Sequence, residues 1–146
     1  RGDLHKTPYK DKEFDTVIAF EVLEHIKDID KVLNEIKRIT RKNVILSVPD
    51  TELYPIFKGS GLTFHHWIDR THTQFFTEES LKAKLKEHGL SLRYFGRLNP
   101  ICPEKIFFES LRCPQGLIKF LTKITGKIPF MKKYYMTLIA VVDTTL

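Results

Sequence analysis

The sequence predicts an α/β fold built around a parallel strand-helix-strand unit, and three segments of the 146-residue chain support this prediction. Residues 14–20 form a short apolar run with β-branched side chains, which is typical of a buried strand. A helical repeat of apolar residues follows, and residues 43–48 form a second apolar run that stops at Pro49. A strand, a helix and a strand within about 35 residues indicate a right-handed crossover between parallel neighbours.

The helix between the two strands is predicted to be amphipathic. Its apolar positions recur at helical spacing and are Ile26, Ile29, Val32, Leu33, Ile36 and Ile39. Asp28 is a suitable N-cap, because its carboxylate can accept a hydrogen bond from the first turn. The basic residues expected at the C-terminal end, where cations complement the helix dipole, are Lys37, Arg38, Arg41 and Lys42.

Residues 50–76 form a long connection, and connections of that length are more often functional than idle. Thr77 is then predicted to cap a helix that ends near Gly89. Two further strands are expected at residues 90–95 and 136–142.

The segment between these last strands, residues 97–133, carries eight Lys or Arg and two Glu, which accounts for the net charge of +6. It is interpreted as an insertion of two short helices that open near Pro103 and Pro114. The second helix has an apolar face with lysines beside it, formed by Leu117, Ile118, Leu121, Ile124, Lys119, Lys123 and Lys127. This pattern fits a helix packed on the fold or one in peripheral contact with a membrane surface. A nucleic-acid partner is disfavoured, because no recognised binding motif accompanies the aromatic residues.

Composition favours a soluble, cytoplasmic protein. Cys102 and Cys113 form neither a CxxC pair nor a disulfide framework, and the apolar run at residues 138–142 is too short to span a membrane. The first residues lack the apolar stretch of a signal peptide and an initiator methionine, so we expect a chain that starts in mid-protein.

The segment FDTVIAFEVLEHI at residues 14–26, together with the order of the elements, resembles the carboxyl-terminal portion of a class I S-adenosylmethionine (SAM) dependent methyltransferase of the small-molecule type. The resemblance covers most of residues 1–96 and 134–146. It implies the second half of a Rossmann-like sheet with an antiparallel terminal hairpin and a helical insertion. Residues 1–146 then form a partial methyltransferase domain, divided into a βαβ portion (1–49), an acceptor-side loop (50–76), a helix and strand (77–96), the insertion (97–133) and a terminal strand (134–146).

The family's glycine-rich GxGxG turn has no counterpart among the seven glycines of this chain. Only Gly59 and Gly61 lie close together, and no suitable strand precedes them. We therefore expect the main cradle of the SAM cofactor to lie outside this sequence. Because a half-sheet exposes apolar edges, we also expect a missing amino-terminal half or a self-association partner.

The resemblance implies cofactor contacts at four residues. Asp3 and Leu4 match the family's adenine-binding segment, although an Asx turn is an equal alternative for so short a match. Phe20 and Glu21 follow the first strand and would border the methionine end of SAM.

Glu21 and His25 are the candidate catalytic residues. Glu21 could hold the acceptor, and His25 has the pKa range of a general base. The alternative for His25 is a structural role in which the ring donates to a neighbouring loop. Glu24 is interpreted as a solvated or capping carboxylate.

His72 and Trp67 are the candidate substrate-binding residues of the connecting loop. The stretch from His72 to Leu81 resembles one that closes over the acceptor in small-molecule methyltransferases, where His72 would either line the pocket or brace the loop. Phe75 and Phe76 are expected to anchor the following helix in the core. No metal ligands are assigned, because adjacent loop histidines rarely converge on one ion.

Two hypotheses follow. The first is SAM-dependent methyl transfer to a small-molecule or lipid-like acceptor, with this chain supplying the acceptor-side half of the site. The second is a non-catalytic scaffold or interaction module that retains the half-fold and could associate with a membrane surface.

Overall fold

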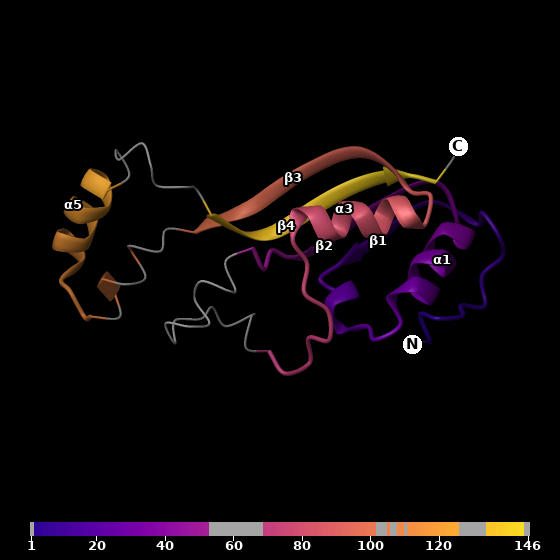
Figure 1. The fold of residues 1–146 in the computed structure, drawn as a ribbon, viewed down its shortest axis with the longest axis horizontal. Helices are drawn as coiled ribbons and strands as arrows, with labels where there is room; N and C mark the ends of the chain where they lie inside the picture. The colour runs from indigo at the N-terminus through magenta and orange to yellow at the C-terminus, as the bar shows by residue number, and fades with distance from the viewer. Residues whose placement is uncertain are drawn as a thin grey trace. The chain divides into compact units, whose positions relative to one another are not determined.

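The structure is a computed structural model, and it describes residues 2–52, 69–101, 105, 108–109, 111–125 and 134–144. Its elements in chain order are β1 (Phe14–Phe20), η1 (Leu23–His25), α1 (Ile29–Ile39), β2 (Thr40–Pro49), α3 (Glu78–Glu87), β3 (Ser91–Ile101), α5 (Gln115–Thr125) and β4 (Tyr134–Asp143). Figure 1 shows this order by colour. The predicted α/β class and all four predicted strands are confirmed.

The four strands form one mixed sheet in the order β1-β2-β4-β3. β1 pairs with β2 in parallel, with Val17 opposite Val44 and Phe20 opposite Ser47. β2 pairs with β4 in antiparallel fashion. β3 and β4 run side by side in opposite directions (Figure 1), so the predicted terminal hairpin is present.

β2 begins three residues earlier than the apolar pattern indicates. Thr40 ends α1 by bonding back to the Ile36 carbonyl through both its backbone N–H and its hydroxyl, and it is already paired with Phe14. Arg41 and Lys42 therefore lie in the strand, where each forms an ion pair with Asp15. Their predicted position at the helix C-terminus is wrong, because the helix ends before them.

The predicted helix starts are confirmed. The Asp28 side chain accepts from the Lys31 N–H at the start of α1. Thr77 forms a capping box with Ser80 at the start of α3. Gly89 follows the end of α3 at φ +62°, a conformation that favours glycine. Its carbonyl accepts from Lys37 of α1, so the end of one helix is tied to the other.

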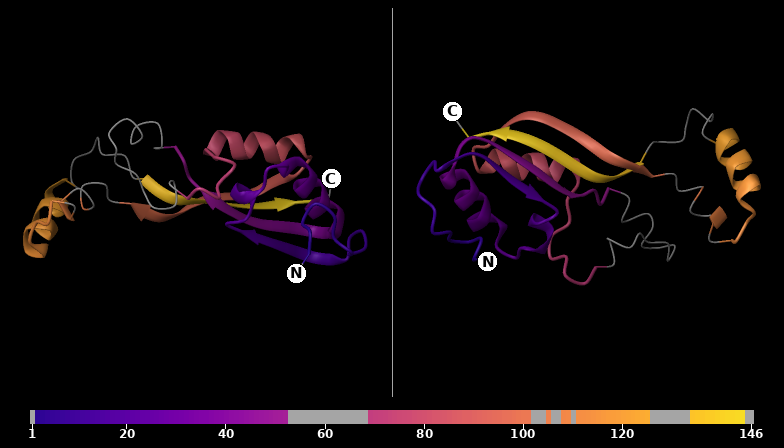
Figure 2. Two further views of the ribbon diagram at one scale, coloured as in Figure 1. Left: turned by 90° about the horizontal axis from the view of Figure 1, so that it is seen from below. Right: turned by 180° about the vertical axis from the view of Figure 1, so that it is seen from behind.

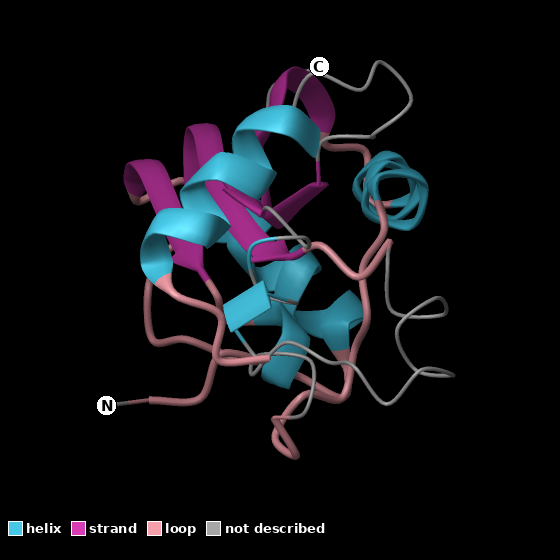
Figure 3. Ribbon diagram, turned by 90° about the vertical axis from the view of Figure 1, so that its left-hand side faces the viewer, coloured by secondary structure: helices cyan, strands magenta, loops and turns pink. Residues whose placement is uncertain are grey.

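α1 and α3 cover the same face of the sheet, since both contribute to one apolar core. The buried members from helices and strands include Val32, Leu33, Ile36, Val44, Leu46, Val48, Leu81, Leu85, Leu138, Ala140 and Val142. Figure 2 shows α3 to one side of the strands, and Figure 3 distinguishes helices, strands and loops by colour in a third view. Asp30 joins the two helices by accepting from Lys84 and His88.

The opposite face of the sheet carries exposed apolar side chains. Ile18 and Phe20 of β1 are 60% and 51% exposed, and Leu92 and Tyr94 of β3 are also exposed. Since β1 ends the described sheet, its outer edge is unpaired among the described residues. The described chain therefore presents an apolar surface at β1 that a folded protein would normally cover.

The chain divides into two compact units, one formed by residues 1–98 with 137–146 and one by residues 99–136. In the second unit, α5 begins directly after Pro114. Its apolar residues differ in exposure: Ile118 is buried, whereas Leu117, Phe120 and Ile124 are exposed. Lys127 lies outside the described residues. Among the described helices, none is long and apolar enough to cross a membrane.

A partly buried ion pair holds the N-terminal segment against α1. Glu35 is buried and accepts from both the N–H and the hydroxyl of Thr7, and from the Nε and Nη2 atoms of Arg38. Arg38 also donates to Asp11. Hydrogen bonds from Arg38 and Thr7 lower the pKa of Glu35 to about 2.

We expect Glu35→Gln to reduce stability at pH 7 by about 1–3 kcal/mol, since the charged hydrogen bonds are lost. Because the pKa of Glu35 is lowered on folding, its contribution is present above about pH 4.5 and disappears as the pH falls toward 2. Urea unfolding between pH 7 and pH 2 should therefore show the wild type and the variant converging. Glu79→Gln, at an exposed site on α3, is the control. A difference that stays constant across this range would contradict the assignment.

Candidate functional site

The carboxyl ends of β1 and β2 meet at one edge of the sheet and bring Glu21 to Ser47. The Glu21 N–H donates to the Ser47 carbonyl at 3.0 Å, and the Ser47 hydroxyl donates to Glu21 Oε1 at 2.7 Å. Glu21 has φ +49°, a left-handed conformation that is uncommon for a residue with a side chain. Such conformations cluster at functional sites, so the geometry favours the prediction that Glu21 is a site residue.

Glu24 lies in the turn after β1 and is almost fully buried, with 1% of its surface exposed. Its Oε2 atom has no hydrogen-bond partner in the described part of the chain. Burial raises the pKa of Glu24, and the negative charges of Glu21 and Asp69 act in the same direction. The interpretation of Glu24 as a solvated carboxylate is therefore wrong, because the turn points its side chain inward.

The segment that precedes α3 is fastened to this turn. The backbone N–H groups of Thr73 and Gln74 donate to the Glu24 carbonyl at 2.7 and 3.0 Å. The Gln74 side chain donates to the Lys27 carbonyl at 3.2 Å. These bonds bring His72 to the end of β1, although the two are far apart in the sequence.

His25 and His72 pack edge to face, with 4.8 Å between their ring centroids. His72 has a buried side chain, whereas that of His25 is 39% exposed. The Thr71 hydroxyl lies 2.9 Å from His25 Nδ1 and donates to Asp69 Oδ1 at 2.7 Å. Because that hydroxyl has a single proton, it accepts from His25 Nδ1, which leaves Nε2 of a neutral ring without a proton.

The other predicted site residues are placed as follows. Asp3 accepts from the N–H and ring of His5, which is the Asx-turn alternative, and Leu4 is exposed. Phe20 ends β1 with its ring exposed. Trp67 lies outside the described residues. Phe76 is buried in the core as expected, but Phe75 is half exposed, so only one of the two aromatic residues anchors α3.

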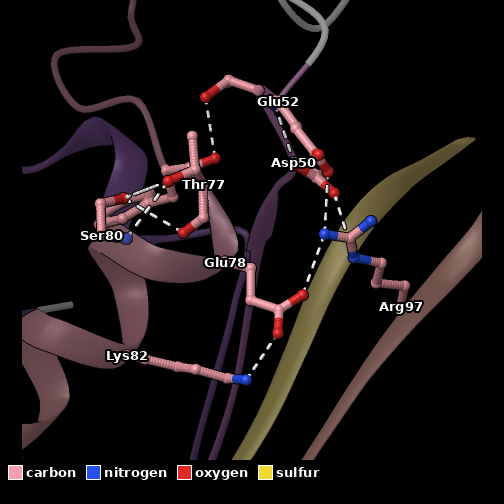
Figure 4. Close-up of polar contacts among 9 residues, drawn as sticks. Asp50, Glu52, Thr77, Glu78, Ser80, Lys82 and Arg97 are labelled. Atoms are coloured by element: carbon pink, nitrogen blue, oxygen red, sulfur yellow. Dashed lines mark hydrogen bonds and ion pairs between the residues drawn. The ribbon is translucent and has the colours of Figure 1, made fainter.

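A second polar cluster lies beside the end of β2 and was not predicted. Figure 4 shows Arg97 of β3 reaching toward the carboxylates of Asp50, Glu52 and Glu78. Its Nη2 atom lies 2.9 Å from both Glu52 Oε2 and Glu78 Oε2, and its Nε lies 3.7 Å from Asp50 Oδ2. Burial raises the pKa of Asp50, while the nearby Arg97 charge opposes that shift.

This cluster borders a cavity of about 300 Å³. Its described lining is polar and consists of Glu52, Thr77, Glu78, Glu79 and Arg97. One feature of the sequence indicates this cluster. Asp50 directly follows a buried strand, and ligands of such sheets bind at the ends of their strands. The role of Arg97 could not be predicted, since this residue is one of several cations in the basic segment 97–133.

The sequence and the fold both match known methyltransferases. Residues 2–94 match the methyltransferase domain family. A demethylmenaquinone methyltransferase of Lactobacillus johnsonii is 25% identical over 118 residues, which are 68% of this chain and 48% of that protein. A norajmaline N-methyltransferase of Rauvolfia serpentina is 39% identical over 57 residues, which are 37% of this chain and 20% of that protein. The chain thus spans half or less of the curated relatives it matches.

Solved structures show the same fold. A SAM-dependent methyltransferase from Archaeoglobus fulgidus superposes with a TM-score of 0.58 at 17% identity, covering 98% of this chain and 66% of that one. The magnesium protoporphyrin IX methyltransferase from Synechocystis gives a TM-score of 0.56 at 17% identity, covering 99% of this chain and 49% of that one. The chain therefore belongs to the methyltransferase domain family and has the Rossmann-like fold of the class I, SAM-dependent enzymes.

Proposed function

We propose that the protein transfers a methyl group from SAM to a small-molecule or lipid-like acceptor at the edge where β1 and β2 end. The observation that supports this most is the convergence of Glu21, His25 and His72 at that edge in a chain of the methyltransferase family. The family implies SAM, which when bound supplies an electrophilic methyl group. The protein's part is then to position the two reactants and to exclude water.

The residues at the end of β1 fit one side of such a cofactor. The exposed Phe20 ring offers an apolar wall, and the left-handed turn at Glu21 bends the chain away from the strand directly after it. Asp3 and Leu4 are proposed to contact the adenine ring, which requires Asp3 to exchange its contact with the His5 ring for the adenine amino group. Gly89 caps a helix and Gly96 lies within β3 beside the Tyr94 side chain, so neither of these two glycines is proposed to hold the cofactor. The residues at this edge are proposed to form the acceptor-side half of the site.

His25 is proposed to remove the acceptor proton. Its Nδ1–H is held by Thr71, so its unprotonated Nε2 atom can accept a proton. Glu21 is proposed to orient the acceptor, while His72 and Trp67 are proposed to line its pocket. The packing of His72 on His25 supports a bracing role as well, since it fixes the plane of the His25 ring.

Helix α5, in the second unit, supports the lipid-like part of the proposal. Leu117, Phe120 and Ile124 form an exposed apolar stripe, and Lys119 and Lys123 are exposed on the same helix. An apolar stripe beside cations suits a lipid-like acceptor or the surface of an anionic membrane. The names of the two curated relatives differ in acceptor, so they do not select one for this chain.

A non-catalytic scaffold is the second candidate. The exposed apolar residues Ile18 and Phe20 at an unpaired strand edge favour it, because such a surface can bind another chain. The scaffold needs the sheet but makes no use of SAM, so cofactor binding separates the two functions.

We expect the intact protein to bind S-adenosylhomocysteine, as measured by isothermal titration calorimetry. Phe20→Ala should weaken binding about tenfold, since an aromatic wall is removed. Tyr94→Ala, at an exposed aromatic residue on the opposite edge strand, should leave the affinity unchanged. No binding by the intact wild-type protein would eliminate the enzymatic function and leave the scaffold.

We expect His25→Ala to lower turnover at least a hundredfold while changing SAM affinity less than threefold, because a general base typically contributes about 10²–10⁴ to rate. Single-turnover rates measured across pH would test this, with His88→Ala on α3 as the control. A His25→Ala variant whose rates match the wild type at every pH would make His25 a structural residue.

We expect the unmodified protein to sediment with anionic vesicles and the double variant Lys119→Glu, Lys123→Glu to remain in solution. Reversing two charges removes the attraction to the anionic surface, worth about 1 kcal/mol per lysine. Lys10→Glu with Lys86→Glu, at exposed lysines in the other unit, is the matched control. If the unmodified protein does not associate with vesicles, the membrane part of the proposal fails.

A further inference from the structure

Three side chains at the end of β1 are arranged as a set of metal ligands. Glu24, His25 and His72 each offer one ligand atom, and these atoms all lie within 4.8 Å of one another. We propose that they bind a divalent transition-metal ion such as Mn²⁺, Fe²⁺, Co²⁺ or Zn²⁺. This goes beyond methyl transfer from SAM, which needs no metal, and it departs from the expectation drawn from the sequence.

The buried carboxylate of Glu24 is the strongest indication of a cation-binding site. A carboxylate with 1% exposure normally has its oxygens paired, yet Oε2 has no hydrogen-bond partner among the described residues. The basic His25 Nε2 atom lies 3.8 Å from Glu24 Oε1, which is longer than a hydrogen bond. A metal ion would supply the missing partner.

His25 already has the orientation and tautomer of a metal ligand. Its Nδ1–H donates to Thr71, which donates to Asp69, so the Nε2 lone pair points toward Glu24. Histidines that bind metals commonly donate their other ring N–H to such a second residue, which fixes the ring. Here the second residue is Thr71, which is itself held by the Asp69 carboxylate.

His72 supplies the third ligand from a segment that is far from Glu24 and His25 in the sequence. Its side chain is only 7% exposed, and its position is set by the bonds of Thr73 and Gln74 to the Glu24 carbonyl. These backbone bonds hold the segment that carries His72 beside the turn that carries Glu24 and His25. The three ligands are therefore brought together by the backbone before any ion binds.

The donor set and the local charge select the class of ion. Two imidazoles and one carboxylate suit Mn²⁺, Fe²⁺, Co²⁺ and Zn²⁺, whereas Mg²⁺ and Ca²⁺ prefer oxygen donors. Glu21, Glu24 and Asp69 place three carboxylates around the two imidazoles, and a divalent cation would offset that charge.

Three protein ligands leave at least one position open. An acceptor hydroxyl bound there would lose its proton more readily. In the metal-bound protein the ion would occupy the Nε2 lone pair and activate the acceptor, so the role of His25 as the base, proposed above, applies to the metal-free protein.

A second cluster in the same unit has its polar groups paired with one another, and it can be compared with the proposed metal site. Asp30, Glu87 and His88 also lie close together. There, His88 Nδ1 and Nε2 lie 2.9 Å from Asn34 Oδ1 and Asp30 Oδ1, and Lys84 pairs with both carboxylates. Both ring nitrogens of His88 already have hydrogen-bond partners within the cluster, so this cluster serves as an internal control.

The test is a titration of the chelator-treated full chain with Co²⁺, followed by visible absorption, with displacement by Zn²⁺ as a second readout. We expect one ion per chain. Glu24→Gln and His72→Ala should each weaken binding at least tenfold, and His88→Ala should leave it unchanged. Far-ultraviolet circular dichroism and urea unfolding identify any variant that fails to fold, and His72→Gln then replaces His72→Ala.

Absence of Co²⁺ binding by the folded wild type would overturn the proposal. Binding that survives in both Glu24→Gln and His72→Ala would also overturn it, because the ion would then use other residues. The titration contains neither SAM nor acceptor, so its outcome does not depend on whether the protein transfers methyl groups. Conversely, if the protein binds Co²⁺ but does not bind SAM, the metal site is supported and only the proposed methyl transfer is contradicted.

Discussion

The parallel pairing of β1 with β2 is the constraint on which the rest of the structure depends. It requires the crossover through α1, and it places the carboxyl ends of both strands at one edge of the sheet. From that edge, Glu21 bonds to Ser47 and the following turn directs Glu24 into the core. The carbonyl of Glu24 then fixes the segment before α3. The candidate site is therefore a consequence of strand pairing, and the residues of one edge bring in a distant loop.

Much of the fold could be predicted because local signals agree with tertiary packing. Asp28 and Thr77 cap their helices as expected, since capping depends on neighbours in the sequence. The start of β2 could not be predicted, because Arg41 and Lys42 suit a helix end in the sequence, whereas Thr40 ends α1 before them and they pair with Asp15 of β1. Phe75 and Phe76 are chemically equivalent in the sequence, and only the pairing of Asp50 with Phe76 shows which of the two is buried.

The candidate site was predictable only in part, for a related reason. The end of β1 stands out in the sequence because an apolar run becomes acidic at Glu21. The burial of Glu24 has no such signal, since a charged residue at the start of a turn is normally exposed. The approach of His72 to His25 depends on backbone hydrogen bonds to a carbonyl, which no side-chain pattern reveals. Arg97 and its carboxylates likewise converge from three separate segments.

The central claim is that cofactor and acceptor meet at the edge formed by the ends of β1 and β2. Amide hydrogen exchange of the intact protein, with and without S-adenosylhomocysteine, tests it most directly. The account predicts slower exchange at residues 20–25 on binding and no change at residues 84–90 at the far end of α3. Slower exchange confined to other segments, or no change anywhere, would contradict it.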